Sequence, residues 1–113
     1  MYVTDADAPL LRNGEIRLYD EAGFEGMRKA GRLVSECLDM LVGQVQPGVE
    51  TGHLDDLIRE FVFDHGATSA TIGYRGYRHA SCISLNHVIC HGIPGPKKLK
   101  NGDIANIDVT VIV

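Results

Sequence analysis

The sequence predicts an α+β protein in which two helices pack on one face of a largely antiparallel sheet. Two segments with apolar residues at helical spacing, 20–45 and 51–65, come first. Shorter segments rich in β-branched residues follow, and glycine and proline separate them. Because the helices precede the strands instead of alternating with them, an α+β arrangement is favoured over a parallel α/β sheet.

The first expected helix covers residues 20–45 and presents one hydrophobic face. Asp20 is expected to cap its N-terminus by accepting from a free backbone N–H group, and Pro47 lies just past its end. The spacing of three and four between its apolar residues indicates a face that packs in the core. These residues are Phe24, Met27, Gly31, Val34, Leu38, Leu41 and Val45.

The second expected helix covers residues 51–65, with Thr51 as its N-cap and Gly66 as its C-terminal stop. Its apolar stripe is also expected to pack in the core and consists of Leu54, Leu57, Ile58, Phe61 and Val62. The first nineteen residues show no steady period. We therefore divide the chain into an N-terminal arm or loop, 1–19, and one domain, 20–113.

Three strands are expected after the second helix, at 67–72, 81–90 and 103–113; for the second, an interruption near Asn86-His87 is an alternative to a continuous strand. The segment 91–96 must be irregular, because its two glycines and two prolines are incompatible with a helix or a central strand. The Asn-Gly pair at 101–102 predicts a tight turn before the last strand, which has the clearest strand pattern in the chain.

Composition limits the classes of function. The chain has 113 residues, of which 44% are hydrophobic and 23% charged, as in an ordinary globular domain. A net charge of −4 disfavours a dedicated nucleic-acid binder. No apolar run reaches the ~18 residues of a membrane span, and the N-terminus lacks the apolar region of a signal peptide. Three cysteines without CxxC spacing indicate free thiols, so we expect a cytoplasmic protein.

Asp108 is the first candidate for a functional site. It lies in the middle of the last strand, between residues that are expected to be buried, and aspartate is unfavourable there. A buried, unpaired carboxylate is costly, so a metal ion, a cation or a group of donors would have to compensate it. Carboxylate oxygen is a common metal ligand. The alternative is a solvent-facing aspartate on the open side of a sheet.

His91 and an aromatic loop are the other candidates. His91 follows the strand at 81–90 and can donate, accept or transfer a proton near neutral pH; the alternative is a strand-end histidine bonded to the backbone. Tyr74, Tyr77 and Cys82 can line an apolar pocket, or they can simply pack against the core. The remaining histidines are expected to be surface or capping groups: His53, His65, His79 and His87.

Four stretches of the chain form a specific combination. They read MRKAGRLVSECLDML, VQPGVETGHLDDLI, GYRGYRHASCISLNHVICHGIP and LKNGDIANIDVTVIV. In this order they resemble the N-terminal half of the type I methionine aminopeptidases. The resemblance covers about 20–113, and the HGIP motif separates it from the related prolidase and creatinase groups.

The resemblance implies a pita-bread fold of two similar αβ halves around a dinuclear metal site, and an activity that removes the initiator methionine from nascent proteins. By position, Asp108 matches the first metal-binding aspartate, and His91 matches the histidine that contacts the substrate and stabilises the reacting peptide group. Tyr74, Tyr77 and Cys82 match the wall of the methionine side-chain pocket. The implied cofactors are two divalent metal ions, with Co, Mn, Fe, Zn and Ni not distinguished. The implied partner is the N-terminal Met of nascent polypeptides.

Departures from the family pattern bear on function. Arg75 stands where many bacterial members have His, and Arg78 stands where Pro is frequent, so both add charge near the expected pocket. The family's other metal ligands would all lie beyond Val113, so we expect a truncated aminopeptidase that is inactive alone and binds no metal tightly. The alternative is a non-catalytic half-fold relative that acts as a binding or assembly module.

The strand at 103–113 is also expected to need a partner. Unpaired strand edges associate readily with other strands. We therefore expect its outer edge to pair with a C-terminal half chain or a second copy of this chain. Its apolar face is expected to consist of Ala105, Ile107, Val109, Val111 and Val113.

Overall fold

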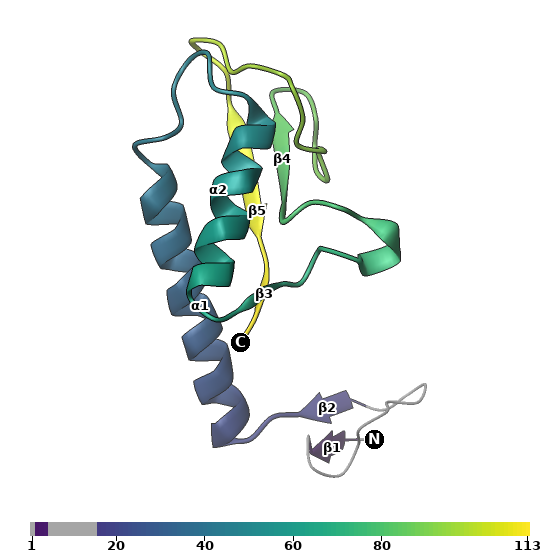
Figure 1. Ribbon diagram of the computed structural model, residues 1–113. Helices are drawn as coiled ribbons and strands as arrows, with labels where there is room; N and C mark the ends of the chain where they lie inside the picture. Colours follow the sequence, from purple (N-terminus) through teal and green to yellow (C-terminus); the bar gives the residue numbers. More distant parts are fainter. Residues whose placement is uncertain (1, 5–15) are drawn as a thin grey trace.

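The computed structural model describes residues 2–4 and 16–113. Two helices, α1 (Glu21–Leu41) and α2 (Thr51–Asp64), lie side by side over the strands of the C-terminal part (Figure 1). The predicted α+β arrangement is therefore confirmed. The other elements are β1 (Tyr2–Thr4), β2 (Ile16–Leu18), β3 (Thr68–Ser69), the 3₁₀ turn η1 (Tyr74–Gly76), β4 (Ser81–Leu85), β5 (Ala105–Val109) and β6 (Val111–Ile112).

Helix α1 begins where predicted but ends at Leu41, short of Val45. The Asp20 carboxylate accepts a hydrogen bond from the backbone N–H of Gly23 at 3.1 Å, which confirms the predicted N-cap. At the other end, the Leu41 carbonyl accepts from the N–H groups of both Gln44 and Val45, so the chain leaves the helix in a turn.

The predicted hydrophobic face of α1 is only partly buried. Of its residues, Leu41 is buried, whereas Phe24 is 48%, Met27 is 73% and Leu38 is 39% exposed. Leu33 and Cys37, which the prediction did not include, are buried instead. The first turns of α1 extend beyond the end of α2 and have no helix beside them (Figure 1). The core-packing prediction is therefore wrong for Phe24 and Met27, because helical spacing indicates a face but not how much of it a neighbouring helix covers. It is also wrong for Leu38, because the buried stripe of α1 runs through Leu33, Cys37 and Leu41.

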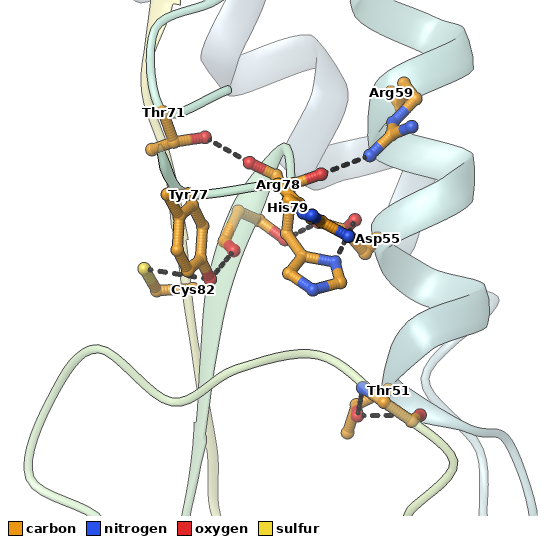
Figure 2. Close-up of polar contacts among 10 residues, drawn as sticks. Thr51, Asp55, Arg59, Thr71, Tyr77, Arg78, His79 and Cys82 are labelled. Atoms are coloured by element: carbon orange, nitrogen blue, oxygen red, sulfur yellow. Dashed lines mark hydrogen bonds and ion pairs between the residues drawn. The ribbon is translucent and has the colours of Figure 1, made fainter. Parts of the chain in front are cut away.

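Thr51 is not the N-cap that we predicted. Glu50 occupies the cap position, and Thr51 is the first residue of α2. The Thr51 hydroxyl instead accepts from the N–H of Gly95 at 2.9 Å and donates to the Gly95 carbonyl at 3.2 Å (Figure 2). It thereby satisfies two backbone groups of the irregular segment 91–96. At the other end, Gly66 adopts a φ of +73°, which confirms the predicted stop.

The sheet is antiparallel where the two helices cover it. Strand β4 pairs with β5 from Ser81↔Val109 to Leu85↔Ala105, and β3 pairs with β6. Strands β3 and β4 both pair with the same edge of the C-terminal strand. The N–H of Ala70, after β3, donates to the Thr110 carbonyl, and the N–H of Asn86, after β4, donates to the Ile104 carbonyl. Residues 71–80, which separate β3 from β4, therefore leave the sheet as a loop that carries η1 outward (Figure 1).

Strand β4 stops at Leu85, so the segment 81–90 is not a continuous strand and is interrupted at Asn86, as the alternative interpretation had it. Asn86 adopts a φ of +51°, a left-handed conformation that asparagine tolerates better than most residues. Its side-chain amide donates to Asp103 at 3.0 Å and accepts from the N–H of Ile104 at 3.0 Å. These two hydrogen bonds connect the turn at Asn86 to the residues that precede β5.

The two faces of the sheet differ. Ala105, Ile107, Val109 and Val111 pack against the core under the helices, as predicted, whereas Val113 remains 47% exposed. The alternate residues of the same strand are exposed, among them Asp108. The buried core consists of Cys37, Leu41, Leu54, Ile58, Val62, Ala80, Ile83, Leu85 and Leu99.

A short strand pair precedes the helices. Strands β1 and β2 are parallel, with Tyr2↔Ile16 and Thr4↔Leu18 in register. We predicted an arm or loop over 1–19, and three-residue strands are too short to show a period of two. The rest of that segment, residues 1 and 5–15, lies outside the described residues. In the described part of the chain, no helix is long and apolar enough to cross a membrane.

Candidate active site

A cavity of about 670 Å³ opens on the side of the sheet away from the helices. The five residues singled out in the sequence all line it, although they come from three separate segments. The lining comprises Ala70, Thr71, Tyr74, Arg75, Gly76, Tyr77, Cys82, His91, Ile93, Asp108 and Thr110. The fold therefore brings the loop at 71–80 with the start of β4, the segment after β4, and the C-terminal strand to one place.

Asp108 and Cys82 face each other across the sheet. They are direct partners in the antiparallel register of β5 and β4, so their side chains share the face that lines the cavity. Asp108 is exposed, and no hydrogen bond or ion pair reaches its carboxylate from the described residues. Of the two alternatives left open by the sequence, this chain has the solvent-facing aspartate and not the buried carboxylate, because the helices cover only the opposite face of the strand.

Tyr77 and Cys82 form one wall of the cavity (Figure 2). The Tyr77 hydroxyl donates to the Ser81 carbonyl at 2.8 Å, and the Cys82 thiol donates to the Tyr77 oxygen at 3.5 Å. Burial raises the pKa of the Tyr77 phenol well above its usual range, and Cys82 and the charge of Asp55 act in the same direction. Tyr77 therefore stays neutral and offers an apolar ring. Tyr74 is 64% exposed and lies at the rim.

The loop that carries the tyrosines is held at both ends by side chains (Figure 2). The Thr71 hydroxyl donates to the carbonyl of His79 at 2.7 Å, and Arg59 of α2 donates to the carbonyl of Arg78 at 2.7 Å. Within the loop, the N–H of Gly73 donates to the Tyr77 carbonyl at 2.7 Å. The bond from Arg59 fixes the loop relative to α2, and the other two join parts of the loop to each other.

His91 lies on a segment that folds back beside β4. The N–H of Ile83 donates to the Gly92 carbonyl at 2.8 Å, and the N–H of Gly92 donates to the Ser84 hydroxyl at 2.9 Å. The approach is so close that a Cβ at Gly92 would lie 2.1 Å from the Ile83 carbonyl oxygen. His91 itself has a φ of +57° and an exposed side chain, whose ring makes no hydrogen bond to the described residues.

A buried polar cluster behind the cavity wall was missed in the sequence. Asp55 of α2 is 1% exposed; it accepts from the Ser81 hydroxyl at 2.6 Å and lies 3.4 Å from Nδ1 of His79 (Figure 2). His79 is therefore a partner of Asp55, and its ring also meets Tyr77 edge-on at 5.5 Å. A signal was available, because Asp55 lies three residues before Ile58 and seven before Val62 and so shares the buried face of the helix with them.

The cavity offers one of the ligands that a divalent metal ion would need. The exposed carboxylate of Asp108 fits that role, since it is unpaired and open to solvent. However, no group of three or more His, Cys, Asp or Glu residues in the described part of the chain could hold a metal ion. Metal ions in proteins are generally held by several such ligands, so these residues do not complete a site.

Comparison with known families gives the class of the chain. A model of metallopeptidase family M24 matches residues 25–113, and the chain belongs to this family. It is 49% identical over 98 residues to the methionine aminopeptidase of Rickettsia prowazekii (strain Madrid E), covering 87% of this chain and 38% of that protein. It is 53% identical over 91 residues to the Escherichia coli (strain K12) methionine aminopeptidase, covering 79% of this chain and 34% of that enzyme.

The similar solved structures are also methionine aminopeptidases. The crystal structure of the Rickettsia prowazekii methionine aminopeptidase has a TM-score of 0.84 and covers 87% of this chain and 40% of that one. The Thermotoga maritima methionine aminopeptidase has a TM-score of 0.82 at 33% identity and covers 86% of this chain and 39% of that one. The fold is thus part of the pita-bread fold, as the resemblance implied. The chain spans somewhat more than a third of the length of these relatives.

Proposed function

We propose that this chain is the N-terminal part of a methionine aminopeptidase, which removes the N-terminal Met from nascent polypeptides in the cytoplasm. One observation carries the proposal. In a chain 49% identical to such an enzyme, the five residues matched to its pocket, substrate contact and metal ligand line a single cavity. Residues 74 and 108 are far apart in the sequence, so their presence in one cavity is a result of the fold and supports the proposal.

Each side chain has a role that its chemistry suits. The Tyr77 ring and the Cys82 thiol offer a weakly polar wall for the thioether of the methionine, and Tyr74 extends that wall to the rim. His91, unpaired and beside the same cavity, can donate a hydrogen bond to the carbonyl oxygen of the first peptide bond as negative charge develops there.

Asp108 would contribute one ligand to the metal site. Divalent metal ions, when bound, supply the Lewis-acid chemistry of peptide hydrolysis. Because the described residues offer a single suitable carboxylate at this cavity, the chain by itself is proposed to bind no metal tightly and to lack activity.

Methionine release from a Met-Ala-Ser peptide tests this function. We expect release from the complete gene product supplied with Co(II) or Mn(II), and none from the 113-residue chain. Asp108→Asn should abolish release and weaken metal binding, while His91→Ala should lower release with the metal retained. A complete gene product that binds partners but releases no methionine with any of the metals would favour the binding or assembly module.

A further inference from the structure

Arg75 places a positive charge on the cavity that nothing in the described chain neutralises. It is exposed and lines the cavity together with Tyr74, and its guanidinium carbon lies 5.4 Å from the centre of the Tyr74 ring. None of the ion pairs among the described residues includes Arg75. Asp108 is the single carboxylate in the lining, and its proposed partner is a metal ion.

The backbone holds Arg75 in one position. It lies within η1 with a φ of +49°, between Gly73 at +86° and Gly76 at +82°. The N–H of Tyr77 donates to the Tyr74 carbonyl at 2.9 Å and closes the turn around it. A left-handed conformation is unfavourable for arginine, so the surrounding turn must impose it. The guanidinium is therefore presented from a defined turn at the mouth of the cavity.

We propose that Arg75 is a specificity-determining residue that binds a carboxylate of the substrate beyond its N-terminal Met. This inference rests on the proposed function. If the methionine side chain occupies the wall of Tyr77 and Cys82, the following residues must leave the cavity across its rim, where Tyr74 and Arg75 lie. Guanidinium groups pair well with carboxylates. The carboxylate can be an acidic side chain or the C-terminus of a short peptide.

The expected preference is modest, since both groups are exposed. Exposed ion pairs stabilise by amounts that correspond to about twofold to fivefold in affinity. Such a contribution falls as ionic strength rises.

Peptide binding to the complete gene product carrying Asp108→Asn, without added metal, tests the inference without hydrolysis and without the Asp108 carboxylate, which shares the cavity with Arg75. The probes are C-terminally amidated Met-Ala-Glu-Glu-Ser and Met-Ala-Lys-Lys-Ser, and Met-Ala-Ser with a free or amidated C-terminus, each labelled away from its N-terminus and followed by fluorescence anisotropy. The variants are Arg75→Gln and the matched control Arg78→Gln. Arg78 is also an exposed arginine of the same loop, but it does not line the cavity.

We expect the glutamate peptide to bind about twofold to fivefold more tightly than the lysine peptide at low salt. Arg75→Gln should remove this difference, and Arg78→Gln should keep it. A preference that appears only with the free C-terminus, and is lost in Arg75→Gln, identifies the terminal carboxylate as the ligand. Equal binding of all peptides, no binding of any, or a preference that survives Arg75→Gln overturns the inference. The proposed function is judged separately, by methionine release from amidated Met-Ala-Ser with metal added.

Discussion

At the scale of single residues, Gly92 decides where His91 lies. Its backbone is bonded to both Ile83 and Ser84, and there is no room for a Cβ beside the Ile83 carbonyl. Gly92→Ala should therefore displace the segment and destabilise the protein by about 1–3 kcal/mol, as overpacking does. Urea unfolding measures the loss. Gly95→Ala is the matched control, since a Cβ there meets nothing within 4 Å; equal stability of the two variants would contradict the prediction.

Ser81 is a second residue whose removal should be costly. Its buried hydroxyl donates to the Asp55 carboxylate, which is itself 1% exposed. Ser81→Ala leaves that carboxylate with one donor fewer in the interior, and a loss of about 1–3 kcal/mol is expected. Thermal unfolding checks it, with Ser35→Ala on the exposed side of α1 as the control. Similar unfolding temperatures for both variants would contradict the prediction and would mean that the buried Asp55 carboxylate does not depend on the hydrogen bond from Ser81.

At the scale of elements, the connection between β4 and β5 should be sensitive to acid. The pKa of Asp103 lies below its usual range, first because the N–H of Lys100 donates to it and then because Asn86 does. A depressed pKa adds stability that is present above the unfolded value, about pH 4, and is lost as the pH falls through the folded value.

Amide exchange at Lys100 and Ile104 should therefore accelerate below about pH 4, beyond the intrinsic dependence of exchange on pH. Asp103→Asn should remove this extra acceleration. Asp64→Asn, at an exposed position that ends α2, is the control and should keep it. If the extra acceleration of amide exchange persists in Asp103→Asn, the Asp103 carboxylate does not stabilise the connection between β4 and β5.

At the scale of the whole molecule, the C-terminal strand has two unlike edges. The edge that includes the Thr110 and Ile104 carbonyls pairs with β3 and β4. The opposite edge, to which the backbone groups of Ile107 and Val109 point, meets no strand in the described residues. We propose that a C-terminal half or a second copy pairs there, as expected from the pattern of the strand.

Amide exchange and sedimentation together test this pairing. In the isolated chain at low concentration, the amides of Ile107 and Val109 should exchange much faster than those of Asn106 and Asp108, which face β4. Raising the concentration or adding a C-terminal half should protect the first pair. Slow exchange at all four positions in a chain that sediments as a monomer would contradict the proposal.

The sequence by itself determined the elements whose signals are local. The cap at Asp20, the stop at Gly66 and the inward face of Ile107 and Val109 depend on neighbouring residues and on a period, and all three are found. The order of helices before strands likewise predicted the α+β class. Ordered motifs from HGIP to NGDIANIDVT predicted the family before any geometry was known.

Tertiary structure alone decided the rest, because those features depend on groups far apart in the chain. Thr51 bonds to Gly95 and not to its own helix, and the buried carboxylate of Asp55 accepts from Ser81; no local pattern identifies either partner. Asp108 is exposed because the helices cover only one face of its strand. The cavity exists because residues 71–80 leave the sheet between β3 and β4 and the segment at His91 folds back beside them. Such contacts are fixed by packing across the chain, and spacing along the sequence does not report them.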